Sequence, residues 1–323
     1  MRQPPPSAPS ARTILMNAIE IRHVSKTFGT HTAVSDLTLD VPGGAIYGFI
    51  GPNGSGKTTT IRMILDLLVP DAGEVSVLGQ PSRSTVRDDV GYLPEERGLY
   101  KRMTVRQVLQ YYGQLKGRSL AALDPEIKRW LDRLQLAAWA DTKVQALSKG
   151  MSQRVQFIST IIARPRLLVL DEPFSGLDPV NADELRDAVL DLRRDGTTVV
   201  LSTHDMNVAE RLCDRIFMIF RGRKVLDGTM TDIHAQFGQD TVRVRTAGGR
   251  AALEGLTGVE SVVDAGNYQD VRVAGDPQAF LRTLASITEV RHFELKKPSL
   301  HDIFVRIASP GVDAPPENGT VSA

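Results

Sequence analysis

The segment that most constrains this chain is a glycine-rich run of eight residues, GPNGSGKT, at positions 51–58. It fits the phosphate-loop pattern G-x-x-x-x-G-K-[ST] at each fixed position. The apolar stretch at 45–50 predicts a buried strand before it, and residues 59–65 predict the first turns of a helix after it. A strand, a glycine loop and a helix in this order predict an α/β protein built around a phosphate-binding turn.

Each residue type in this loop has a physical reason to bind a chain of phosphates. The glycines let the backbone N–H groups point inward, and the helix start adds its positive end. Lys57 is expected to reach the β- and γ-phosphates, and the Thr58 hydroxyl to ligate Mg²⁺. The predicted nucleotide contacts in and beside the loop are Gly51, Asn53, Gly54, Ser55, Gly56, Lys57, Thr58 and Thr59.

Length and composition narrow the class of protein. A chain of 323 residues suits two domains, and its 41% hydrophobic and 24% charged residues are ordinary for a soluble globular protein. A net charge of +1 gives no overall attraction to nucleic acid, so we expect no nucleic-acid partner. The single cysteine excludes an intramolecular disulfide. No apolar run approaches the roughly 18 residues needed to cross a bilayer.

Patterning along the chain divides it into four regions. Residues 1–16 and 308–323 are rich in proline, serine and alanine, and we expect them to be disordered tails. Residues 17–235 alternate strand-like and helical segments, with a helical subdomain at about 95–165. Residues 240–307 show the order β-α-β-β-α-β-α, which predicts a small ferredoxin-like α+β domain.

Two strand ends carry side chains that suit phosphate chemistry. Asp171 and Glu172 end the apolar strand at 167–170, where a carboxylate can hold Mg²⁺. Asp171 suits the metal, whereas Glu172 suits a general base that acts on an attacking water. His204 follows another buried strand and is placed to donate to a γ-phosphate oxygen. Alone, an Asp-Glu pair often ends a strand merely as solvated charge, and a lone histidine at a strand end is more often structural. The upstream phosphate loop is what favours catalysis here.

Residues 147–151, Leu-Ser-Lys-Gly-Met, predict a helix start that can bind a second anion. Ser148 is a favoured N-cap residue, and Gly150 permits close approach to the backbone. The hydroxyl, the free N–H groups and the helix dipole would together attract a phosphate. From these residues alone, an ordinary capped helix start is the simpler interpretation.

Taken in order, these segments resemble the nucleotide-binding subunit of an ATP-binding cassette (ABC) transporter. The loop at 51–58 resembles Walker A, and Asp171 and Glu172 resemble Walker B with its catalytic glutamate. Residues 147–151 resemble the signature motif, and residues 175–178 resemble the D-loop. The resemblance covers about 17–235 and implies a P-loop NTPase cassette, in which a RecA-like core carries a helical subdomain.

The resemblance also extends the candidate site and suggests a subgroup. Phe28 stands where the family places an aromatic ring under adenine, and His204 stands at the switch histidine. Residues 294–300 resemble the extra domain of a sodium- and drug-exporter-like subgroup. The resemblance thus implies catalytic Glu172, His204 and Lys57, further nucleotide contacts at Phe28, Ser148, Gly150 and Asp178, and metal ligands at Thr58, Glu95 and Asp171.

Two motifs depart from the family's pattern. Glu95 stands where the family has the Q-loop glutamine; a carboxylate still ligates Mg²⁺ but adds negative charge near the phosphates. Lys149 and Met151 replace a glycine and a glutamine of the signature motif, which most often reads LSGGQ. The phosphate-facing pair Ser148 and Gly150 remains. We therefore expect a working signature motif, and hydrolysis that Glu95 tunes or slows.

The resemblance implies an ATPase that uses ATP and Mg²⁺ to power a transporter. In this family two cassettes pair head to tail, so ATP at Lys57 of one is capped by Ser148 and Gly150 of the other. A second ATP-binding subunit, in a homodimer, is therefore expected. An integral membrane permease subunit is expected to dock on the helical subdomain, with this chain lying peripherally on the cytoplasmic face of the cell membrane. Export is preferred, on the subgroup resemblance alone.

Two other functions are compatible with such a cassette. A soluble ABC ATPase that acts on nucleic acid or ribosomes usually has tandem cassettes or a long coiled-coil insertion. This chain has one phosphate loop and no sustained heptads, which disfavours that alternative. A regulatory subunit that binds nucleotide without hydrolysing it is disfavoured by Glu172 and His204.

Overall fold

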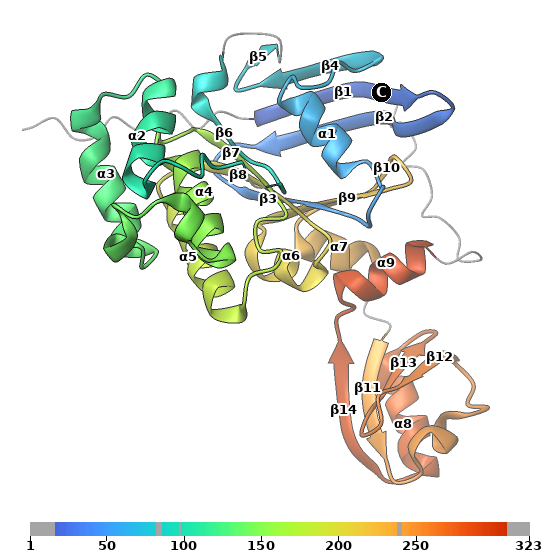
Figure 1. The fold of residues 1–323 in the computed structure, drawn as a ribbon. Coiled ribbons are helices and arrows are strands. Elements are labelled where there is room, and N and C mark those ends of the chain that lie inside the picture. The colour runs from blue at the N-terminus through green and yellow to red at the C-terminus, as the bar shows by residue number, and fades with distance from the viewer. Residues whose placement is uncertain (1–16, 82–85, 97, 238–240, 309–323) are drawn as a thin grey trace, which may run out of the picture. The chain divides into compact units, whose positions relative to one another are not determined.

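The computed structural model describes residues 17–81, 86–96, 98–237 and 241–308 (Figure 1). The tails expected at 1–16 and 308–323 lie outside these residues, except for Ala308, which ends a helix. The chain divides into two compact units, Met1–Asp227 and Gly228–Ala323. Within the described ranges, no helix combines the length and the apolar character needed to cross a membrane.

The first unit contains a four-stranded sheet in the order β2-β1-β4-β5. Its strands are β1 (Asn17–Phe28), β2 (His31–Pro42), β4 (Ala72–Val77) and β5 (Gln80–Pro81). The pairs β1–β2, β1–β4 and β4–β5 are antiparallel. The hairpin of β1 and β2 pairs Phe28 with His31 at its turn.

A six-stranded sheet in the order β10-β9-β3-β8-β7-β6 forms the centre of the first unit. Its strands are β3 (Ile46–Ile50), β6 (Val90–Leu93), β7 (Leu167–Asp171), β8 (Thr198–Thr203), β9 (Arg215–Phe220) and β10 (Arg223–Gly228). The strands β9, β3, β8, β7 and β6 pair in parallel. Since β3, β8 and β7 are neighbours, the loops that follow their carboxyl ends lie at one edge of the sheet.

Helices lie on both sides of this sheet (Figure 1). An apolar core packs on each of its two faces. The helices are α1 (Lys57–Ile64), α2 (Val105–Leu115), α3 (Leu120–Arg133), α4 (Lys149–Ile161), α5 (Pro179–Arg194) and α6 (Met206–Leu212), with short 3₁₀ helices η1 (Val86–Asp89), η2 (Ala137–Trp139) and η3 (Val144–Ala146). Leu167 and Val169 of β7 pack toward α1 and the first sheet, whereas Leu168 and Leu170 pack in the core that contains α2 to α6. Because both faces are covered, the strand is apolar throughout.

The second unit contains an antiparallel sheet in the order β12-β13-β11-β14. Its elements are α7 (Met230–Phe237), β11 (Thr241–Thr246), η4 (Gly249–Leu253), β12 (Val259–Asp264), β13 (Gln269–Val273), α8 (Pro277–Ile287), β14 (Val290–Lys296) and α9 (Leu300–Ala308). Its separate core includes Val242, Val271 and Phe280. The element order agrees with the ferredoxin-like prediction, but the first helix of that order is only the 3₁₀ helix η4.

The division between the units lies N-terminal to the boundary expected at about 235–240. Helix α7 is tied to the C-terminal segment of its own unit. Nε2 of His234 donates to the carbonyl oxygen of Pro298 at 3.0 Å, and Arg306 donates to the carbonyl oxygen of Phe237 at 3.3 Å. These contacts place α7 in the second unit, although most of its residues belong to the region 17–235 that the sequence pattern assigned to the first unit.

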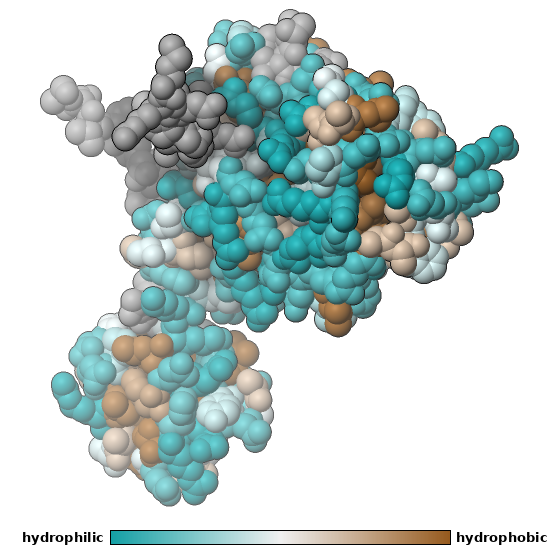
Figure 2. All heavy atoms as spheres, turned by 90° about the vertical axis from the view of Figure 1, so that its left-hand side faces the viewer, coloured by the Kyte–Doolittle hydropathy of each residue, from teal (hydrophilic) through white to brown (hydrophobic). Residues whose placement is uncertain are grey.

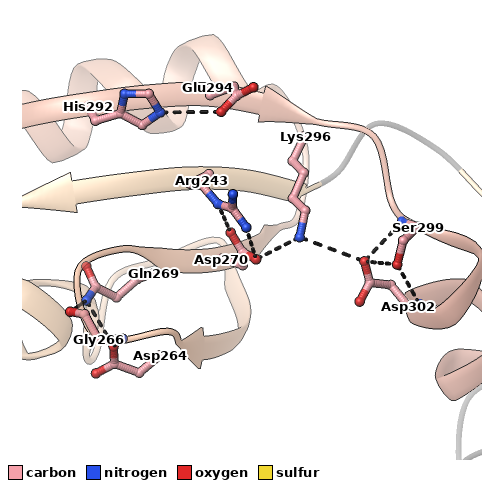
Figure 3. A network of polar contacts seen from close by, with 10 residues as sticks. All are labelled: Arg243, Asp264, Gly266, Gln269, Asp270, His292, Glu294, Lys296, Ser299 and Asp302. Atoms are coloured by element: carbon pink, nitrogen blue, oxygen red, sulfur yellow. Dashed lines mark hydrogen bonds and ion pairs between the residues drawn. The ribbon is translucent and has the colours of Figure 1, made fainter. Parts of the chain in front are cut away.

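A polar network joins the second unit's sheet to α9 (Figure 3). Arg243 donates two hydrogen bonds to Asp270, at 2.7 and 3.0 Å, and Nζ of Lys296 donates to the same carboxylate at 2.8 Å. Nζ of Lys296 also lies 3.9 Å from Asp302, which accepts from Ser299 at the start of α9. Arg243 first, and then Lys296, hold the pKa of Asp270 below its ordinary value.

Candidate functional site

The loop at 51–58 connects β3 to α1, as predicted, and steric contacts require glycine at two of its positions. At Gly51, with φ +154°, an added Cβ would lie 2.3 Å from the carbonyl oxygen of Ile219. At Gly56, with φ +113°, an added Cβ would lie 2.5 Å from the carbonyl oxygen of Ala33. A larger residue at either position would have to displace backbone, so the shape of the loop depends on both glycines.

Lys57 is a buried cation at the start of α1. Its Nζ donates to two carbonyl oxygens of the loop, that of Gly51 at 2.6 Å and that of the next residue at 3.0 Å. Burial lowers the pKa of this ammonium, whereas the charges of Glu172, Asp171 and Glu95 act to raise it. The loop therefore holds a positive charge within electrostatic reach of three carboxylates.

One pocket brings together most of the residues predicted for the site. It is lined by Phe28, His31, Ala33, Asn53, Gly54, Ser55, Gly56, Lys57, Thr58, Thr59, Glu95, Asp171, Glu172, Ser175 and His204. Only His31, Ala33 and Ser175 among them were not predicted from the sequence. His31 reaches the pocket because the tight turn of the hairpin pairs it with Phe28, so recognition of that turn could have found it.

Glu172 and His204 contact each other directly in this pocket. Nδ1 of His204 lies 2.7 Å from Oε1 of Glu172, and the backbone N–H of His204 donates to the same oxygen at 2.9 Å. The Thr203 hydroxyl donates to Oε2 at 3.4 Å. Glu172 itself has φ +50°, in the left-handed region that non-glycine residues rarely adopt. The backbone and three donors thus give this carboxylate a defined orientation.

The oxygen atoms beside the loop suit a hard divalent cation. Asp171 is buried at the end of β7, and burial raises the pKa of its carboxyl, with Glu95 and Glu172 adding to the rise. Thr58, Glu95 and Asp171 line the same pocket and offer the oxygen ligands that Mg²⁺ prefers. The described residues contain no group of three or more His, Cys, Asp or Glu that could hold a metal. An ion here would therefore also need phosphate or water oxygens.

Four predicted residues lie outside the lining of the pocket. One is Gly51 at the start of the loop itself, and the other three lie at the starts of two other helices. Ser148 caps α4, and its hydroxyl accepts from the N–H of Met151 at 3.2 Å. Asp178 caps α5 and accepts from the N–H of Asn181 at 3.1 Å. A Cβ at Gly150 would lie 3.6 Å from Nδ2 of Asn181, so the two helix starts are neighbours. A single chain does not bring the residues at these helix starts to its own phosphate loop.

Comparison with known proteins identifies the families of both units. The ABC transporter family matches residues 34–175, and the family described as ATP-binding protein DrrA1-3-like, C-terminal domain, matches residues 228–308. The uncharacterized ABC transporter ATP-binding protein YhaQ of Bacillus subtilis (strain 168) is 39% identical over 289 residues, which cover 89% of this chain and 97% of the relative. The Nod factor export ATP-binding protein I of Burkholderia lata is 34% identical over 293 residues, covering 90% and 96%.

A solved structure supports the same relationship. The ATP binding subunit of an ABC transporter matches with a TM-score of 0.65 and 31% identity, covering 68% of this chain and 93% of that chain. This match confirms the α/β cassette fold predicted from the sequence. The relatives favour a transporter ATPase over an ATPase that acts on nucleic acid or ribosomes. The chain belongs to the ATP-binding proteins of ABC transporters, the ATPases that power transport.

Proposed function

We propose that this chain binds ATP with Mg²⁺ in the pocket beside the phosphate loop and hydrolyses it with Glu172 as the general base. The observation that carries this proposal is the direct contact of Glu172 with His204 in the pocket that Lys57 and Asp171 also line. A base needs a fixed orientation within reach of the attacking water, and a histidine bonded to one carboxylate oxygen provides it.

The chain's own groups have distinct parts in this chemistry. The loop N–H groups and Lys57 would neutralise phosphate charge, and the half-exposed ring of Phe28 is free to stack on adenine. Thr58, Asp171 and Glu95 would hold Mg²⁺, which when bound neutralises the charge of the β- and γ-phosphate oxygens. Removal of a proton from water by Glu172 then produces the nucleophile.

We infer that a second copy of the chain completes the site. Ser148, Gly150 and Asp178 lie outside the pocket, yet Ser148 and Gly150 lie at the start of α4, where free N–H groups and the helix dipole attract a phosphate. A head-to-tail homodimer would bring the start of α4 of one subunit to the phosphate loop of the other. Each of the two sites then needs both subunits.

We further propose that the chain exports its cargo with an integral membrane permease subunit, on the cytoplasmic face of the cell membrane. The Nod factor relative is named for export, and the second unit matches the DrrA1-3-like family. The side of the molecule that carries α2 and α3, which faces the viewer in Figure 2, mixes hydrophobic with hydrophilic residues. Tyr100, Leu115 and Leu120 are exposed in this region, as suits contact with a partner.

The first test of this function is a Glu172→Gln variant of the full chain. It is expected to bind ATP without hydrolysing it, and to accumulate as a dimer in the presence of ATP and Mg²⁺, as measured by light scattering. Lys57→Ala is expected to lose ATP binding, because it removes the full positive charge from the loop. Lys128→Gln, on an exposed part of α3, serves as the control and should leave binding and hydrolysis unchanged.

Two results would contradict the proposal: hydrolysis at the wild-type rate by Glu172→Gln, or a monomer of that variant at saturating ATP. The permease is tested separately, by co-purification of the chain with an integral membrane protein and by measurement of ATPase activity with and without it.

A further inference from the structure

A second pocket adjoins the phosphate-loop pocket and shares three of its carboxylates. It is lined by Leu93, Pro94, Glu95, Glu96, Lys149, Gln153, Gln156, Asp171, Glu172, Pro173 and Ser175. Glu95, Asp171 and Glu172 also line the phosphate-loop pocket, where Lys57 is the cation. Among the described residues that line the second pocket, the cation is Lys149. The three carboxylates therefore share one pocket with Lys57 and another with Lys149.

Lys149 comes from the segment at 147–151, but its side chain lies against the loop that follows β7 of its own chain. Its Nζ lies 3.2 Å from the position that a Cβ on Gly176 would take. Gly176 follows Glu172 in the loop between β7 and α5 and has φ +71°. The ammonium thus lies beside the loop that carries the general base.

One face of α4 fixes this arrangement. Lys149, Gln153 and Gln156 follow one another at the i, i+4, i+7 spacing of a single helix face. Nε2 of Gln153 donates to the carbonyl oxygen of Pro173 at 2.5 Å, and Nε2 of Gln156 donates to the carbonyl oxygen of Glu96 at 3.2 Å. These bonds hold α4 against the segments that follow β7 and β6. The start of α4 is therefore anchored near both carboxylate-bearing segments.

The two departures from the family's pattern meet in this pocket. Glu95 adds one negative charge where the family has glutamine, and Lys149 adds one positive charge where it has glycine. The carboxylates repel one another, and this repulsion needs a counter-charge in the absence of a metal. Because Glu95 and Lys149 line the same cavity, their opposite charges act on the same group of carboxylates.

We propose that Lys149 acts on the nucleotide site of its own subunit, where its charge offsets that of Glu95. The inference rests on the proposed function and adds that neighbouring residues of the segment at 147–151 act on different nucleotides. Ser148 and Gly150 would act on the nucleotide of the partner, whereas the residue between them acts within its own chain. Without the charge of Lys149, the negative charge of Glu95 is no longer offset and repels ATP, which weakens binding. Without the charge of Glu95, the positive charge of Lys149 strengthens ATP binding.

The test measures the affinity of the full chain for a fluorescent ATP analogue in EDTA, at concentrations where light scattering shows a monomer. Lys149→Gln is expected to raise Kd about three- to tenfold, the effect of one charge near the phosphates. Glu95→Gln should lower Kd by a similar factor, and the double variant should return to the wild-type value. Lys149→Arg should bind like the wild type, because it keeps the charge.

Lys128→Gln is the matched control, since it removes the same charge from an exposed position on α3. The inference is wrong if the monomeric Lys149→Gln variant binds like this control, or if the double variant binds as weakly as Lys149→Gln alone. An effect of Lys149 that is seen only in the dimer would also overturn it. Lys57→Ala distinguishes a failure of the proposed function from a failure of this inference. If Lys57→Ala still binds the analogue, the proposed function fails. If it does not bind, only the role of Lys149 is in question.

Discussion

The carboxylate of Glu172 is positioned by its backbone as much as by its hydrogen-bond partners. A left-handed conformation at a non-glycine residue costs on the order of 1 kcal/mol or more and persists only where the surroundings enforce it. Here the N–H of Glu172 donates to the carbonyl oxygen of Ser202 at 3.0 Å, which ties the residue to β8. The side chain therefore leaves β7 in the direction of His204. The fold itself thus orients the carboxylate that we propose as the general base.

At this scale we predict that His204→Ala slows hydrolysis without weakening ATP binding. The histidine contacts Glu172, so its loss should leave the base poorly oriented and lower kcat about 100-fold. The affinity for ATP should stay within about twofold of the wild type, because we propose that the loop and Lys57 provide most of the phosphate contacts. Steady-state ATPase assays and nucleotide titration measure the two effects. His23→Ala, at an exposed histidine paired with Asp36, is the control, and an unchanged kcat in His204→Ala would refute the role.

At the scale of elements, the start of α4 combines a structural and a proposed binding role. Ser148 caps the helix through its hydroxyl, and the same hydroxyl is proposed to meet a phosphate of the partner. The simpler interpretation of its sequence, a capped helix start, is confirmed by the structure. The two roles differ in their response to charge, because a cap tolerates a carboxylate and a phosphate contact does not.

Ser148→Asp and Ser148→Ala should therefore separate the roles. The alanine variant is expected to lose about 1 kcal/mol of unfolding free energy in the first unit, together with ATP-dependent dimerisation. The aspartate variant should keep the cap and its stability but fail to dimerise with ATP, since its charge repels the phosphates. Chemical denaturation and light scattering measure these outcomes. Dimerisation of the aspartate variant with ATP would exclude Ser148 from the partner's phosphate site.

The elements also show what local sequence can predict. The strand β7 and the loop at 51–58 were predicted because their signals, apolar continuity and glycine spacing, are local. The first helix expected in the second unit is not an α-helix. Gly249 and Gly255 both have positive φ, which leaves room only for a 3₁₀ turn. That Lys149 and Glu95 line the same pocket could not be predicted either, since it depends on how α4 packs against segments distant in sequence.

At the scale of the whole molecule, each unit has an apolar core of its own. The first unit has the two cores that flank the six-stranded sheet, and the second has a core around Phe280 and Leu284. Both units are built from continuous stretches of chain that meet between Asp227 and Gly228. Separate cores predict separate unfolding transitions, so the two units can be perturbed independently.

We predict that acid destabilises the second unit through Asp270. Its pKa is lowered in the folded state, so the stability it contributes is present above its unfolded pKa of about 3.9 and is lost as the pH falls below that value. Asp270→Asn should lower the unfolding free energy of the second unit by about 1 kcal/mol at pH 7. It should also make the unfolding transition of that unit less dependent on pH below about 4. Calorimetry of the full chain measures the change in stability and its dependence on pH. An identical pH dependence in the variant, or a shift confined to the first unit's transition, would contradict this account.

The place of β3 in its sheet has a consequence for how the chain is made. Ile46 of β3 pairs with Val199 of β8, and Tyr47 pairs with Arg215 of β9, both far downstream. At typical rates of synthesis these partners leave the ribosome roughly ten seconds or more after β3. During that interval both edges of the apolar strand β3 are unpaired, and such edges can associate with other nascent chains. We therefore expect β3, the strand that precedes the phosphate loop, to be the segment of the nascent chain that depends most on chaperone protection from aggregation.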